Sequence, residues 1–175
     1  MSTVDAPLIL TAQLPQEIHA RYTALRWAHF PPERNFLEAH VTLFHALPAM
    51  SQEEIVRWCR RLASEYAEVP AKVIGLMSLG QGTAIRLESP AMLRLRDRLA
   101  DAFHGLLTAQ DQHRPRLHVT IQNKVTSAEA KVLQAQLDGV IQPHAFTFRG
   151  LALHRYLGGP WEPLKTFAFR GRAEA

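Results

Sequence analysis

The sequence predicts an α+β fold of two lobes, each built on an antiparallel sheet, with a central cleft between them and helices packed outside. Two observations predict it. A His-x-Thr motif occurs at His40 and again, 78 residues later, at His118. Each motif precedes a capped helical segment and then two strands joined by a glycine turn. We therefore expect one bilobal domain over residues 1–175, with pseudo-repeat halves at roughly 36–88 and 114–171, each half forming its own sheet.

The composition is that of a soluble globular protein. The chain has 175 residues, of which 47% are hydrophobic and 21% charged, which suits one compact domain. No apolar run is long enough to span a membrane, and residues 1–7 lack the features of a signal peptide. We therefore expect a cytoplasmic protein without a membrane partner. We also expect a monomer, because no heptad repeat or long apolar stripe is evident.

The charged residues and the single cysteine limit the possible chemistry. A net charge of +4 permits an anionic substrate without requiring one. Cys59 is the only cysteine, so neither an intrachain disulfide nor a cysteine-based zinc site can form. The other histidines lack the spacing of a metal site. We therefore expect no metal and no cofactor.

The elements of the first half follow from short signals. An apolar run at residues 8–14 predicts a buried strand, and Pro15 then opens a helix. A strand is expected over 36–44, which contains the first motif. Residues 51–54, Ser-Gln-Glu-Glu, have the spacing of a capping box and predict a helix to about Ala67.

The elements that follow repeat this order. Strands are expected at 72–79 and 83–88, joined by the Gly-Gln-Gly turn, and Ser89-Pro90 predicts the start of a helix. The second half is predicted to contain a strand at 116–125, a helix that a capping box at residues 126–129 begins, and two closing strands at 145–156 and 163–170.

The two motifs carry the chemistry. In a strand, residues i and i+2 point to the same face, so His40 lies beside Thr42 and His118 beside Thr120. Phosphodiester cleavage needs one group to accept a proton and another to donate one, and imidazole can do either near neutral pH. The two threonine hydroxyls can hold the phosphate oxygens. We predict these four residues as the catalytic set.

Chance recurrence of the motif is an insufficient explanation. On this composition a histidine matches His, hydrophobic, Ser/Thr, hydrophobic at a rate of about 2%, and the chain has nine histidines. Either motif alone fits an ordinary strand histidine in the core or at the surface. Two copies at equivalent positions of a duplicated unit favour a functional pair.

The motifs His40-Val41-Thr42-Leu43 and His118-Val119-Thr120-Ile121 resemble those of the two-histidine phosphoesterase superfamily, the RNA 2',5'-ligase and cyclic phosphodiesterase family. The resemblance in element order extends from about Leu8 to Arg170. It implies metal-independent cleavage of a 2',3'-cyclic phosphate or a 2',5'-linked phosphodiester in RNA or a nucleotide. It also implies that both histidines and both threonines are catalytic. In hydrolysis we assign His118 as the base and His40 as the acid.

Four further residues are candidates for substrate binding. Arg116 and Lys124 lie an even number of positions from His118, so in a strand they would point to the same face as His118. Both are cations suited to binding phosphate. Phe44 shares the parity of His40, and Tyr156 flanks the turn at residues 158–160; either ring has the chemistry to stack on a base.

Two other functions stay open at this level. The fold is compatible with a non-catalytic module that binds RNA or a nucleotide. It is also compatible with a metal-dependent hydrolase that uses clustered histidines.

Overall fold

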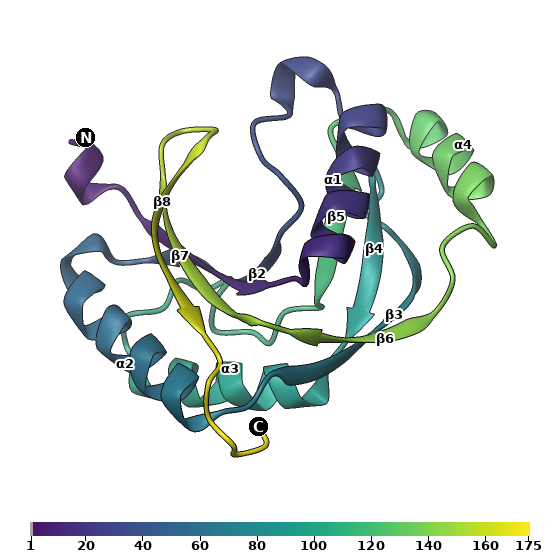
Figure 1. Cartoon of the computed structure of the whole chain (residues 1–175). Helices are drawn as coiled ribbons and strands as arrows, with labels where there is room; N and C mark the ends of the chain where they lie inside the picture. The colour runs from purple at the N-terminus through teal and green to yellow at the C-terminus, as the bar shows by residue number, and fades with distance from the viewer. Residues whose placement is uncertain (1) are drawn as a thin grey trace.

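The computed structural model describes residues 2–175 and forms two four-stranded sheets with four α-helices within that range (Figure 1). None of the helices in these residues is long and apolar enough to cross a membrane. The helices are α1 (Gln16–His29), α2 (Gln52–Glu65), α3 (Pro90–Ala102) and α4 (Ser127–Leu137).

Both sheets are antiparallel throughout. The first has the order β2-β1-β7-β8, and the second has the order β5-β4-β3-β6. The strands are β1 (Leu8–Gln13), β2 (Val41–Leu47), β3 (Val69–Ser78), β4 (Thr83–Glu88), β5 (His118–Gln122), β6 (His144–Phe148), β7 (Gly150–Tyr156) and β8 (Trp161–Ala168). This arrangement confirms the predicted α+β fold with two antiparallel sheets.

The sheets do not coincide with the two halves of the sequence. β1 and β2 pair with β7 and β8 from the far end of the chain, while β5 and β6 complete the sheet of β3 and β4. The expected strand at 145–156 is interrupted at Arg149, so β6 and β7 belong to different sheets. The expectation of one sheet per half was wrong, because hydrophobic alternation identifies a strand but not its partner.

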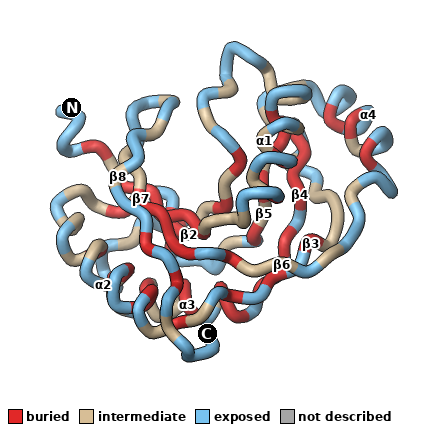
Figure 2. The backbone as a smooth tube through the Cα atoms, viewed as in Figure 1, coloured by how far each residue is buried: buried red, intermediate tan, exposed pale blue. Residues whose placement is uncertain are grey.

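The helices lie outside the sheets, as predicted. α2 packs against β7 and β8, α4 packs against β3 and β4, and α1 lies beside β5. Figure 2 shows buried backbone along the strands and along the inner sides of the helices. Buried apolar side chains from both sheets form one cluster, which includes Leu10, Phe44, Ile85 and Phe148. The shared core fixes the two sheets relative to each other.

The loops that flank the sheets contain the expected hairpins. The amide of Leu79 donates to the Gly82 carbonyl at 2.9 Å, and that of Leu157 donates to the Pro160 carbonyl at 2.9 Å. A Cβ at Gly82 would collide with the Gln122 carbonyl, so this turn requires glycine for close approach to β5.

All four predicted helices begin where expected, and two of the three predicted side-chain caps are confirmed. The hydroxyl of Ser89 accepts from the Met92 amide at 3.1 Å, with Pro90 in the first turn. Thr126 and Glu129 form a reciprocal capping box. The capping box at Ser51 was wrong: its side chain makes no capping hydrogen bond. A 3-10 turn at Ala49–Ser51 leads directly into α2, so Ser51 lacks the extended backbone that a capping hydroxyl needs.

These caps allow a matched stability test. Ser89→Ala is expected to lower the free energy of unfolding by about 1 to 2 kcal/mol, because the buried hydroxyl also donates to the Pro70 carbonyl at 2.7 Å. Ser51→Ala is expected to change it by less than about 0.5 kcal/mol. Urea unfolding of the two variants measures both values, and equal losses would contradict this account of the caps.

Candidate active site

The strand that follows His40, β2, and the strand that begins with His118, β5, occupy equivalent positions in their sheets. β2 and β5 each form one edge of a sheet, and the two strands contact each other. Thr42 lies opposite Thr11 of β1, and Thr120 lies opposite Ala84 of β4. His118 begins β5, whereas His40 immediately precedes β2. The expected strand at 36–44 therefore starts later than predicted, and residues 36–40 form a loop segment.

Each of the two imidazoles makes the same type of hydrogen bond, from Nδ1 to the backbone carbonyl two residues earlier. Nδ1 of His40 lies 2.8 Å from the Glu38 carbonyl, and Nδ1 of His118 lies 2.6 Å from the Arg116 carbonyl. A carbonyl oxygen can only accept, so Nδ1 of each ring carries a proton and donates. Nε2 of each ring is thereby left for another partner.

The pKa of His40 is strongly perturbed. Burial of the ring lowers this pKa to about 4, against the opposing effect of the Glu38 carbonyl. The charges of Arg26, His154 and His118 lower it further. His40 is therefore a neutral imidazole at pH 7.

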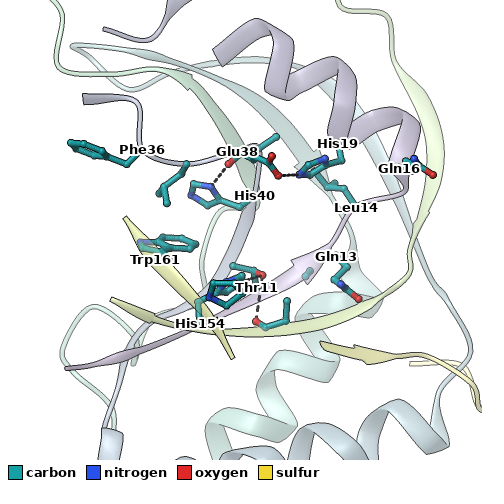
Figure 3. Close-up of a pocket in the computed structure, with 15 residues that line it drawn as sticks. Thr11, Gln13, Leu14, Gln16, His19, Phe36, Glu38, His40, His154 and Trp161 are labelled. Atoms are coloured by element: carbon teal, nitrogen blue, oxygen red, sulfur yellow. Dashed lines mark hydrogen bonds and ion pairs between the residues drawn. The ribbon is translucent and has the colours of Figure 1, made fainter. Parts of the chain in front are cut away.

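His40 borders a cavity of about 530 Å³ (Figure 3). The cavity lies between the first sheet, the start of α1 and the 36–40 segment. The Trp161 ring lies 4.5 Å from the His40 ring and 5.3 Å from the His154 ring, measured between centroids. Nε2 of His154 lies 3.1 Å from the Thr11 hydroxyl. Burial also lowers the pKa of His154. Trp161 and His154 thus give the cavity an aromatic wall beside His40.

The Arg26 side chain makes hydrogen bonds both to the second motif and to the segment that precedes the first motif. This side chain of α1 is 3% exposed. Its guanidinium donates to the Thr120 carbonyl at 2.8 Å, to the Leu37 carbonyl at 3.1 Å and to Oδ1 of Asn35 at 3.2 Å. Burial lowers its pKa to about 10, so it stays charged at pH 7. One cation therefore joins β5 to the segment that leads to His40.

The candidates for substrate binding are dispersed. Arg116 is exposed and lines a separate hollow at the start of β5, together with Arg86. Lys124 is exposed beyond the end of β5, with a positive φ of 59°. Tyr156 pairs with Trp161 at the β7–β8 hairpin but does not line the cavity beside His40. None of these three side chains lies on that cavity, so their roles remain predictions.

Phe44 is a correction to the sequence analysis. Its side chain is fully buried, with the guanidinium of Arg96 4.2 Å from its ring centre and the Phe103 ring 6.1 Å away. It cannot stack on a substrate. The parity argument failed because the pairing of β1 with β2 shifts register near Leu10, so Leu43 and Phe44 are both buried in succession.

Several residues of the site were not identified as such from the sequence. His154, Thr11 and Arg26 reach it through pairings between distant segments, which no local pattern reports. Arg86 lies directly opposite His118 on β4 and is exposed. Only Trp161 had a local signal that could have indicated a place in the site, because it directly follows the glycine turn at residues 158–160. Among residues 2–175, no three His, Cys, Asp or Glu side chains are grouped so that they could hold a metal ion.

The fold is an α+β arrangement of two four-stranded antiparallel sheets, with the two His-x-Thr motifs at the edge strands β2 and β5. Residues 14–160 match the 2'-5' RNA ligase superfamily, and the chain belongs to this family. No curated protein sequence matches the chain.

Solved structures share this fold at low sequence identity. TT0787 of Thermus thermophilus has a TM-score of 0.66 and 19% identity, with 95% of this chain and 100% of that chain covered. LigT of E. coli in complex with 3'-AMP has a TM-score of 0.58 and 19% identity, covering 94% and 98%. The crystal structure of a phosphoesterase has a TM-score of 0.57 and 20% identity, also covering 94% and 98%.

Proposed function

We propose that this chain is a metal-independent phosphodiesterase that cleaves a 2',3'-cyclic phosphate or a 2',5'-linked phosphodiester in RNA or a nucleotide. His40 and His118 act as general base and general acid, and Thr42 and Thr120 bind the phosphate oxygens. The substrate is the nucleotide or RNA itself, and the reaction needs no cofactor.

The matched hydrogen bonds of the two histidines are the main support. Each Nδ1 donates to the carbonyl two residues earlier, at 2.8 Å for His40 and 2.6 Å for His118. His144 makes the same bond at 2.9 Å but begins β6, whereas the strand that follows His40 and the strand that begins with His118 contact each other. The bond fixes each tautomer, and the contact of β2 with β5 makes the two rings suitable as an acid/base pair, because each Nε2 is left for the reacting oxygen.

The lowered pKa of His40 supports one assignment of roles. A ring that is neutral at pH 7 can accept a proton, so His40 is the base in hydrolysis and His118 the acid. This reverses the assignment made from the sequence. Nε2 of His40 takes a proton from water as its oxygen attacks phosphorus. His118 then protonates the ribose oxygen as its bond to phosphorus breaks, which leaves a 2'- or 3'-monophosphate.

A nucleoside suits the cavity beside His40. Its volume of about 530 Å³ falls in the range of small-molecule sites, and Trp161 offers an aromatic ring at its wall. LigT, which shares the fold, is known in complexes with 3'-AMP, NADP+ and ATP. These likenesses support a nucleotide substrate.

The role of His40 predicts the pH dependence. With a pKa of about 4 in the free enzyme, His40 loses its proton above that pH and can then act as a base. We expect kcat/KM to rise through about pH 4 on its acidic limb, below the ordinary histidine value of about 6.5. If His40 were the acid instead, kcat/KM would fall as the pH rises above about 4, by about tenfold per pH unit.

The proposed activity is tested by incubating the protein with nucleoside 2',3'-cyclic phosphates and with a 2',5'-linked dinucleotide in the presence of a strong chelator. Release of a monophosphate from either class supports the proposal and identifies which bond breaks. Absence of turnover on every member, or turnover that the chelator abolishes, would contradict it.

A further inference from the structure

Three hollows adjoin one another along the surface formed by residues 27–38. The first is the cavity beside His40. The second, of about 370 Å³, shares residues 36–38 with the first. The third, of about 580 Å³, shares Trp27 with the second and extends to Lys124. These shared residues place the three hollows one after another between His40 and Lys124, and this series is called the path below.

Two aromatic side chains stand exposed along this path. Trp27 is 73% exposed, and Phe36 is 57% exposed. Phe36 borders the first and second hollows, and Trp27 borders the second and third. The Phe36 ring also lies against the backbone of Gly159, in the β7–β8 turn. Successive exposed rings beside a basic residue are the usual means by which proteins hold unpaired bases.

We propose that this path binds single-stranded RNA, which is therefore the substrate class of the site in preference to a mononucleotide. The terminal nucleotide occupies the cavity beside His40, and the neighbouring bases stack on Phe36 and Trp27. Lys124 contacts a backbone phosphate beyond them. This inference rests on the proposed function for its chemistry, while the path itself rests on the shape and exposure of the surface.

The charges on the path determine the kind of binding. Glu38 pairs with His19 at 3.2 Å, and Glu129 accepts from the amide and hydroxyl of Thr126 in the helix cap. Glu33 is a further acid in the third hollow. With these acids present, stacking supplies most of the affinity. Lys124→Gln is therefore expected to reduce the slope of log affinity against log salt concentration by only about 0.7.

The path is tested by the binding of a labelled single-stranded RNA of about six nucleotides, measured by fluorescence anisotropy. Trp27→Ala is expected to weaken binding by about tenfold, because it removes one stacked ring, and Trp27→Phe is expected to restore most of the affinity. Met50→Ala is the matched control, since Met50 is 93% exposed but lies on the turn before α2. Native affinity in Trp27→Ala would overturn the proposal, whether or not the chain proves to be an enzyme.

Kinetics separate this inference from the proposed function. For an RNA that ends in a 2',3'-cyclic phosphate, Trp27→Ala is expected to lower kcat/KM about tenfold more than for a nucleoside 2',3'-cyclic phosphate. Equal effects on the two substrates would overturn the extended site while leaving the activity established. Weaker RNA binding by Trp27→Ala, in a protein whose native chain hydrolyses neither of these substrates nor a 2',5'-linked dinucleotide, would support the path and contradict the proposed function.

Discussion

Replacing His40 or His118 with alanine is expected to lower kcat for a nucleoside 2',3'-cyclic phosphate by about 10²- to 10⁴-fold. Each substitution removes a positioned proton donor or acceptor, and effects of that size are typical of general acid–base catalysis. KM is expected to change far less, because both threonines and the cavity wall remain. Steady-state kinetics on the two variants measure the losses.

His144 provides a matched control for this prediction. Its Nδ1 lies 2.9 Å from the Gln142 carbonyl, which is the same local hydrogen bond that His40 and His118 make. It begins β6, however, at the edge of the second sheet opposite to β5. His144→Ala is therefore expected to leave kcat unchanged, and a loss comparable to that of His118→Ala would contradict the assignment of the pair.

Arg26→Met is expected to reduce both stability and turnover. The substitution keeps an unbranched chain in the site but leaves three acceptors without their donor, at Thr120, Leu37 and Asn35. At roughly 1 kcal/mol for each lost hydrogen bond, the free energy of unfolding is expected to fall by about 3 kcal/mol. kcat is expected to fall by about tenfold or more, because β5 and the segment before His40 lose their common anchor.

Arg96→Met distinguishes anchoring of the site from general destabilisation. Arg96 is as deeply buried as Arg26 and also donates to backbone carbonyls, those of Leu43 and Asp111. It does not contact β5 or the 35–38 segment through these bonds. Both variants are expected to lose stability in urea unfolding, but the loss of kcat per unit of lost stability is expected to be larger for Arg26→Met. Equal ratios would show that Arg26 acts only on stability.

The sequence could predict much of the fold because the relevant signals are local. The start of α3 at Ser89-Pro90 and the capping box at Thr126 each depend on a few adjacent residues. The two His-x-Thr motifs are separated by the same number of residues as the glycine turns that follow them. Strand pairing is a property of distant segments. The pairing of β1 with β7 and the separation of β6 from β7 therefore could not be predicted from alternation alone.

The same distinction applies to the candidate site. His40 and His118 are recognisable because each stands two residues before a threonine. Alternation along the strand predicted that Phe44 would share the face of His40. The register shift between β1 and β2 buries Phe44 instead. His154 and Arg26 were not predicted, because both reach the site across contacts of more than 90 residues in sequence. Their local surroundings resemble those of an ordinary strand and an ordinary helix.

The most direct test of the central claim is a double-mutant cycle of His40→Ala and His118→Ala, assayed on a nucleoside 2',3'-cyclic phosphate with chelator present. Two groups that act as one acid–base pair give strongly non-additive losses. The kcat of the double variant is therefore expected to be about equal to that of the less active single variant. Losses that multiply, or native turnover in either single variant, would contradict a mechanism in which the two histidines work together.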